Sequence, residues 1–335
     1  MVAYAFIGIG VGACGTSLLA LMAKRVAPKR RAAAATTVWM MMIAGFAITA
    51  TTVGKALEPF SYERLVDITA FVSMAAFAVT VVAMWGLEGA ASAPVEEKAE
   101  KPSMREALTQ VWAEPNARRF TAFVFVSMLA YSAQDLVLEP FAGAVFGWTP
   151  GESTQLAGAQ HGGVFVGMLL VAVLTTVFSK TRLGDLRGWV IGGCLGSAVA
   201  MAGLCVAGLV ANPSWPLQAN VFVLGLFNGI FCIAAIAAMM ALAGKGRKAR
   251  EGTRMGIWGA AQAIAFALGG FLGTVVVDAV QWGLGSTSVA YAAVFGLEAL
   301  GFLAAQVLAA GTRFDAAVVN AEIGDAFLEP IGQEA

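Results

Sequence analysis

The residues with the clearest chemical potential are acids within an otherwise apolar stretch. Asp135 and Glu139 are four residues apart, so they share one face of a helix. Ionisable groups at membrane depth are costly, and two carboxylates on one face cannot both ionise cheaply, so at least one is expected to stay protonated. Pro140 follows and is expected to kink the helix and to free a backbone carbonyl. The pattern predicts a functional polar site; the alternative is that these acids hydrogen-bond facing helices and fix their register.

The only histidine of the chain lies in the next apolar stretch. His161 is preceded by Gln160 and followed by Gly162 and Gly163. Imidazole is a common metal ligand, and adjacent glycines let a large flat ligand or a neighbouring helix approach closely. About the fifth residue of its span, His161 is expected roughly 5–10 Å below the outer membrane surface. The alternative is a helix-terminal histidine wetted by lipid headgroups.

The acids and the histidine are predicted to lie at matching depths. Counted along a helix from Arg119 at the inner surface, Asp135 lies about 24 Å up, in the outer half of the bilayer. We therefore expect one polar cluster from the two spans, made of Gln134, Asp135, Glu139, Gln155, Gln160 and His161. Three isolated polar residues in later spans are expected to be helix–helix contacts: Asn228, Gln262 and Glu298. The sequence shows no Ser-His-Asp arrangement, P-loop or dinucleotide fingerprint, so an enzyme is the least favoured class.

Membrane helices must position these residues. The 335 residues are 59% hydrophobic and 13% charged, with a mean hydropathy of +0.77, whereas a soluble domain carries about 25% charged residues. Zero net charge also argues against a nucleic-acid binder. About 20 apolar residues cross a bilayer as a helix. Nine stretches qualify, which predicts an all-α polytopic membrane protein: 2–23, 33–54, 65–86, 120–147, 157–179, 188–211, 218–243, 255–278 and 289–311.

The basic residues predict the orientation of these spans. Nineteen of the 21 lysines and arginines fall in alternate connections or after the last span, and only Lys55 and Arg64 fall on the other side. Basic connections mark the cytoplasmic side of a membrane protein. We therefore expect the N-terminus outside and the C-terminus in the cytoplasm.

An internal repeat predicts the domain organisation. A glycine-bearing helix, a basic loop and a helix with a tryptophan occur twice, the two tryptophans being Trp39 and Trp258. Six-helix halves of facilitator-type transporters repeat in this way. The expected parts are a three-helix partial N-terminal bundle (1–86), a cytoplasmic linker with a short amphipathic helix (87–118), a six-helix C-terminal bundle (119–311) and a cytoplasmic tail (312–335). The repeat also predicts three further helices ahead of the first span.

Four segments closely resemble the PucC/LhaA family, the bacteriochlorophyll-delivery branch of the major facilitator superfamily. They are 130–153 (AYSAQDLVLEPFAGAVFGWTPGES), 156–163 (LAGAQHGG), 15–19 (GTSLL) with its basic loop, and 57–60 (LEPF). The resemblance implies a multi-pass protein of the bacterial inner, intracytoplasmic photosynthetic membrane. It implies a role in light-harvesting complex assembly, by handing bacteriochlorophyll to the antenna α and β polypeptides or by chaperoning them. The reaction-centre complex is a further expected partner. The resemblance also implies three family helices ahead of those that this sequence contains.

The resemblance gives the predicted cluster a ligand. His161 is then the expected axial ligand of the bacteriochlorophyll magnesium, with room for the ring at Gly162 and Gly163. Hydrogen bonds to the ring carbonyls are expected from the acid and amide side chains Gln134, Asp135, Glu139 and Gln160.

Two other functions remain open. One is a proton-coupled exporter of a small solute or porphyrin, in which Asp135 and Glu139 relay protons. The other is a structural subunit or assembly protein that binds antenna or reaction-centre complexes without transport, through small-residue faces such as 192–196.

Overall fold

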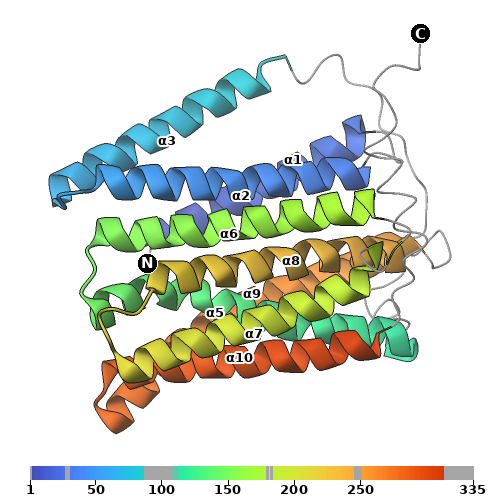
Figure 1. Cartoon of the computed structure of the whole chain (residues 1–335). Coiled ribbons are helices and arrows are strands. Elements are labelled where there is room, and N and C mark those ends of the chain that lie inside the picture. The colour runs from blue at the N-terminus through green and yellow to red at the C-terminus, as the bar shows by residue number, and fades with distance from the viewer. Residues whose placement is uncertain are drawn as a thin grey trace.

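The computed structural model describes residues 2–26, 31–86, 112–178, 184–244 and 251–312, together with Thr109 and Thr181. These residues form long helices and no strand (Figure 1). In chain order the helices are α1 (Val2–Arg25), α2 (Arg31–Ala56), α3 (Tyr62–Met84), α5 (Pro115–Phe146), α6 (Pro150–Val177), α7 (Leu186–Val210), α8 (Leu217–Gly244), α9 (Glu251–Leu284) and α10 (Thr287–Gly311). The predicted all-α polytopic membrane protein is confirmed. Eight of these helices are long and apolar enough to span a membrane, and α1 contributes a shorter apolar segment, Ala5–Gly15.

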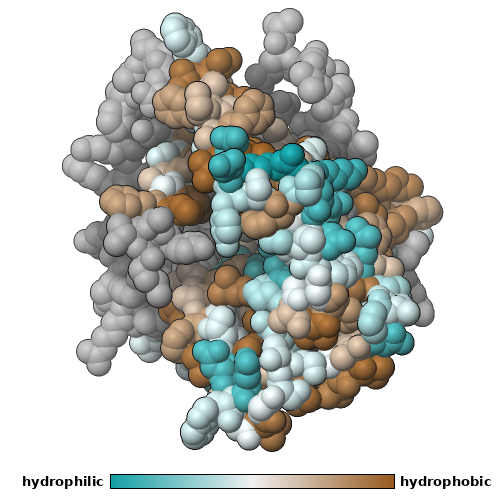
Figure 2. All heavy atoms as spheres, turned by 90° about the vertical axis from the view of Figure 1, so that its left-hand side faces the viewer, coloured by the Kyte–Doolittle hydropathy of each residue, from teal (hydrophilic) through white to brown (hydrophobic). Residues whose placement is uncertain are grey.

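The helices run up and down, and their short connections lie at one end of the molecule. Figure 1 shows the links α2–α3, α5–α6, α7–α8 and α9–α10 at its left-hand side. The ends of α1, α3, α6 and α8, from which the chain continues into the basic connections, lie at the opposite end. Figure 2 faces the short-connection end and shows polar residues gathered there. The positive-inside rule would place this end outside the cell, and that orientation stays a prediction.

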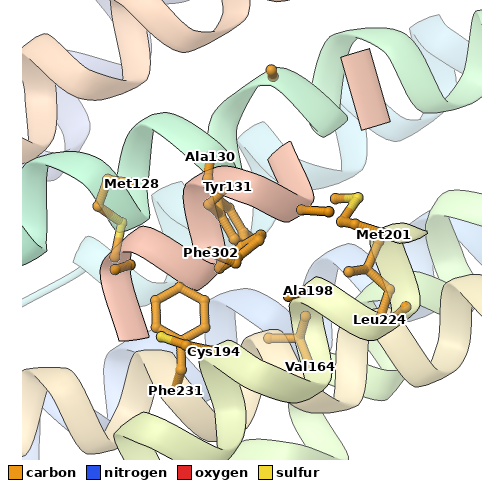
Figure 3. Close-up of a cluster of buried hydrophobic side chains, with 14 of the residues drawn as sticks. Met128, Ala130, Tyr131, Val164, Cys194, Ala198, Met201, Leu224, Phe231 and Phe302 are labelled. Atoms are coloured by element: carbon orange, nitrogen blue, oxygen red, sulfur yellow. The ribbon is translucent and has the colours of Figure 1, made fainter. Parts of the chain in front are cut away.

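Helices α5–α10 form the packed bundle that positions the candidate site. The main pairs are α6 with α8, α7 with α10, α5 with α9, α7 with α8, and α5 with α10. Aromatic side chains join them: Phe231 on α8 packs edge-to-face on Phe302 of α10, with ring centroids 5.5 Å apart, and contacts Tyr131 of α5 at 6.3 Å (Figure 3). Such aromatic pairs stabilise a fold by more than the burial of their apolar surface alone would.

Two arginines hold the opposite end of the same bundle together. Arg119 of α5 donates to the carbonyl of Gly311 at 3.1 Å, and Arg187 of α7 donates to the carbonyl of Ala310. Both carbonyls lie in the last turn of α10, where cations interact favourably with the helix dipole. The ends of α5, α7 and α10 are thereby fixed relative to one another.

The first three helices pack much less. Only α2 lies firmly against the bundle, through α6, while α1 makes a few contacts with α2. Helix α3 has no buried residue, and Figure 1 shows it leaving the bundle along its length. Whether upstream helices cover these faces stays a prediction. Most of the linker predicted at 87–118, namely residues 87–108, 110 and 111, lies outside the described residues, as does the tail beyond Thr312.

Helix α6 begins at Pro150, well ahead of the span predicted from residue 157. Thr149 caps it, accepting from the backbone N–H of Glu152 at 3.1 Å, while the Glu152 carboxylate accepts from the Thr149 N–H at 2.8 Å. The proline occupies the first helical turn, where its missing N–H costs nothing. This capping box starts the helix in polar residues that resemble a loop by composition alone.

Candidate functional site

The polar residues in the membrane form one layer across the bundle. Asp135 lies about three helical turns before the end of α5 at Phe146, and His161 lies about three turns after the start of α6 at Pro150. Both are therefore about 16 Å along the helix from the short-connection end. This agrees with the predicted match in depth, but it places His161 deeper than predicted, because α6 starts earlier. Asn228 and Glu298 lie equally far from the starts of α8 and α10, so they share the layer.

His161 faces helix α2, and one of its two ring nitrogens is already hydrogen-bonded within α6. Its Nδ1 lies 2.8 Å from the carbonyl oxygen of Ala157, one turn earlier on α6. Since a carbonyl only accepts, Nδ1 carries the proton and Nε2 keeps its lone pair. Phe46 of α2 stands edge-to-face to the imidazole, with centroids 5.3 Å apart. The hydrogen bond and the aromatic contact thus fix the orientation of the half-buried ring. A histidine that binds a metal is usually held in this way through its other ring nitrogen.

The two glycines after His161 have different surroundings. A Cβ on Gly163 would meet the carbonyl oxygen of Phe222 and the backbone of α8, so this glycine admits a helix and leaves no space for a ring. A Cβ on Gly162 would meet nothing within 4 Å. Of the two uses predicted for this pair, Gly163 serves the neighbouring helix and Gly162 provides the open position beside the histidine.

The close approach of α6 and α8 uses four glycines. Gly163 and Gly167 on α6 face the backbone of α8, and Gly225 and Gly229 on α8 face the backbone of α6 at Gln160 and Val164. Within each helix the two glycines are one turn apart, the arrangement that lets membrane helices cross with their backbones in contact. This crossing fixes the helix that carries His161.

Asp135 lies on the open side of α5. Its side chain is exposed, as is that of the neighbouring Leu136, whereas Glu139 is half-buried. Gln160 of α6 is the polar side chain next to Asp135. No hydrogen bond or ion pair among the described residues joins either acid to His161. The structure therefore brings Asp135 and Gln160 together and turns His161 toward α2.

Gln134 belongs to a separate network in the middle of the bundle. Asn228 of α8 donates from Nδ2 to Gln134 Oε1 at 3.3 Å, and Ser197 of α7 donates to Asn228 Oδ1 at 2.8 Å. All three side chains are fully buried. The predicted helix–helix role of Asn228 fits this chain of bonds, which links α5, α7 and α8.

Glu298 of α10 completes this buried group. Its side chain is 4% exposed, and neither carboxylate oxygen has a hydrogen-bond partner among the described residues. It lies against Gln134, whose Nε2 is also unpartnered, and it interacts electrostatically with Asp135. Buried polar atoms are nearly always paired, so an orphaned carboxyl requires an explanation.

Sequence reasoning treated Asn228 and Glu298 as isolated residues, because nothing near them in the chain is polar. Both residues lie the same number of residues after the start of their helices, and this equal spacing is the sequence signal that places them in one layer. The small-residue face at 192–196 is used within the bundle, since Gly193 and Gly196 pack against Phe231 and Phe227 of α8. Among the described residues no group of three or more His, Cys, Asp and Glu side chains is placed to hold a metal ion. His161 would thus act as a single ligand.

Replacing Asn228 with leucine is expected to lower the free energy of unfolding by about 1–2 kcal/mol, because Ser197 and Gln134 both lose their partner. Thermal unfolding in detergent measures the change. Ser197→Ala is the matched control, since it removes a single bond at the end of the network and should cost about half as much. An Asn228→Leu protein as stable as the unaltered one would show that the network does not hold these helices.

Comparisons with known proteins identify the family of this chain. A sequence model of the family described as "PUCC protein" matches residues 1–314. The chain is 52% identical over 309 residues to the "Bacteriochlorophyll synthase 44.5 kDa chain" of Rhodobacter capsulatus, covering 92% of this chain and 71% of the relative. It is 30% identical to an uncharacterized protein in the puhA-bchM intergenic region of Rhodobacter capsulatus, covering 93% of this chain and 63% of that protein.

A "Protein PucC" of Rhodobacter capsulatus is 28% identical over 306 residues, which cover 89% of this chain and 64% of the relative. The chain therefore spans between three-fifths and three-quarters of the length of these relatives. No solved structure matches it. Since the family match extends over nearly the whole sequence, this chain belongs to the PucC protein family.

Proposed function

We propose that this protein assists the assembly of light-harvesting complexes by delivering bacteriochlorophyll to the antenna α and β polypeptides. The expected location is the bacterial inner, intracytoplasmic photosynthetic membrane, with the C-terminus in the cytoplasm. Membership of the PucC family supports the proposal, as does the name of the relative with 52% identity, which refers to bacteriochlorophyll. Chaperoning of the antenna polypeptides, with the reaction-centre complex as a further partner, belongs to the same proposal.

Two observations carry the proposal: Nε2 of His161 makes no hydrogen bond among the described residues, and the next residue, Gly162, has open space at its Cβ position. His161, a neutral imidazole with its proton fixed on Nδ1, would hold the magnesium of a bacteriochlorophyll through Nε2. The Nδ1 bond to Ala157 sets this tautomer. The position also lies in the membrane interior, where the apolar body of the pigment is soluble.

The acids and amides of the layer differ in whether a bound pigment could reach them to accept a hydrogen bond. Asp135 and Glu139 are exposed and half-buried, respectively, so a ligand on the open face of α5 reaches them. Gln134 and Gln160 are buried against other helices. We therefore keep the two acids as the proposed hydrogen-bonding residues and assign the two glutamines to the support of the site.

Deletion of the gene in its phototrophic host tests this function. The account expects membranes with much less assembled light-harvesting complex, while bacteriochlorophyll synthesis continues. Antenna absorption of the membranes, with pigment extracted and quantified from the same cells, measures both quantities. Restoring the gene on a plasmid is the control. Loss of pigment synthesis itself would instead support a catalytic role, as the word synthase in the name of one relative suggests.

A proton-coupled exporter is the second candidate, because Asp135 is an exposed acid at mid-membrane depth. It predicts flux of a porphyrin or small solute in vesicles that depends on a proton gradient and is abolished by Asp135→Asn. Unchanged antenna levels in the Asp135→Asn strain, together with lost flux, would favour the exporter over pigment delivery.

A further inference from the structure

Glu298 is the side chain that neither the fold nor the pigment proposal explains. It is 4% exposed and lies about 16 Å from the helix end, and both of its oxygens lack a partner among the described residues. An apolar side chain would suit such a position, and Phe295 and Phe302 occupy buried sites along the same helix. An acid there is costly and marks a functional site in a membrane protein.

Among the described residues, no positive charge compensates this carboxyl. The ionisable side chains near the layer are Tyr131 and Asp135 on α5, Cys232 on α8 and Cys194 on α7, and none of them is a cation. The arginines of α5 and α7 lie at the far ends of those helices, where Arg119 and Arg187 bond the end of α10. His161 is turned toward α2. Bare ionised carboxylates are not stable in such surroundings, so Glu298 holds a proton.

Asp135 connects the buried carboxyl to the surface of the bundle. It is exposed on the open face of α5, and it is the ionisable group that interacts electrostatically with Glu298. Gln134, the neighbour of Asp135 in sequence, lies against Glu298 and has an amide nitrogen without a partner among the described residues. One carboxyl is therefore buried in the core and the other is exposed, and the backbone of Gln134, next to Asp135 in sequence, lies against the buried one.

We propose that Glu298 and Asp135 form a proton-binding pair, in which Glu298 stores the proton and Asp135 exchanges it with the open face of α5. In the exchange step the O–H bond of Glu298 breaks and an O–H bond forms on the Asp135 carboxylate, so one negative charge moves from α5 to α10. Asp135 then gives the proton up to a water molecule that reaches the open face of α5. The site binds a proton whether or not the chain delivers pigment.

Apolar packing beside Glu298 favours the binding of a proton over the binding of a metal cation at this carboxyl. Tyr131, Phe231 and Phe302 pack together beside this layer (Figure 3). A proton is the ligand that neutralises a carboxyl without requiring further ligand atoms. A metal cation would require several more oxygen ligands, and no metal-binding group of three or more His, Cys, Asp and Glu side chains occurs in the described part of the chain.

Infrared spectroscopy of the purified protein in lipid nanodiscs tests the pair. At neutral pH the unaltered protein should show a C=O band from a protonated, weakly hydrogen-bonded carboxyl, and Glu298→Gln should remove it. Glutamine has the shape of the neutral acid, so we expect this variant to fold. Asp135→Asn should keep the band but slow its shift in D₂O by about tenfold or more, the effect of about 1.4 kcal/mol on a barrier. Glu63→Gln, an exposed acid in the first turn of α3, is the control and should change neither observation.

Two results would overturn the proposal. A spectrum unchanged by Glu298→Gln would mean that Glu298 is not the protonated group. Equal exchange rates in the unaltered and Asp135→Asn proteins would mean that Asp135 is not the route. The second comparison leaves Glu298 in place, so it decides the matter even if the Glu298 variant does not fold. Neither measurement depends on pigment, so failure here and failure of the delivery function are distinguishable.

Discussion

Replacing Gly163 with alanine is expected to destabilise the bundle by about 1–3 kcal/mol. The added methyl group would meet the carbonyl oxygen of Phe222 and the backbone near Leu226, so α6 and α8 must separate. Backbone atoms cannot move aside as a flexible side chain does. Thermal unfolding in detergent, followed by circular dichroism, measures the loss, and Gly163→Leu should prevent recovery of folded protein.

Gly162→Ala is the matched control at the adjacent position of the same helix. Its new methyl group enters open space, so its free energy of unfolding should be unchanged or slightly increased by the better helix propensity of alanine. Equal losses at the two positions would contradict the α6–α8 crossing described above.

Replacing His161 with alanine is expected to reduce the bacteriochlorophyll retained by the purified protein by about tenfold or more, equivalent to about 1.4 kcal/mol of binding free energy. The reason is loss of Nε2, the ring nitrogen that keeps its lone pair while Nδ1 bonds Ala157. Absorption of the purified protein, with the extracted pigment quantified against protein, measures the change. Folding should persist, because the half-buried ring bonds only its own helix and touches Phe46 at its edge.

Two further variants make the histidine experiment specific. Gln155 was predicted to join the cluster, but its side chain packs against Gly54 of α2, so Gln155→Ala should retain the pigment. Gly162→Leu should remain folded but bind less pigment, since it fills the open position. The same pigment content and the same spectrum in the His161→Ala protein would show that the ligand assignment is wrong.

Much of the architecture was predictable from hydropathy, because a helix that spans a membrane must be long and apolar throughout. Eight of the nine predicted spans are confirmed by length and composition. The errors lie at helix ends. At the start of α6, Glu152 and Ser153 resemble a loop by composition, but the capping bonds of Thr149 begin the helix there.

The depth of the site residues in the membrane was predictable from the sequence, but the neighbours that their side chains face were not. Counting residues from a helix end gives the height of Asp135 and His161, since every residue rises by about 1.5 Å. Which neighbour each side chain meets depends on how the helices are rotated and packed. Gln134 and Asp135 are adjacent in sequence, yet one is fully buried against Asn228 and the other is exposed.

The buried network was missed for the same reason. Ser197, Asn228 and Glu298 come from three helices, and each is surrounded in sequence by apolar residues. Only the tertiary packing brings them to Gln134. A test of equal spacing from the helix ends would have suggested the layer, because hairpins of similar length align their midpoints.

Purification of the protein from its native membrane in a mild detergent tests the central claim most directly. An absorption spectrum and mass spectrometry of the same sample report the pigment and the accompanying polypeptides together. Pigment delivery predicts bacteriochlorophyll in the purified protein, with antenna α and β polypeptides alongside it. A colourless protein with neither pigment nor antenna polypeptides would contradict the account.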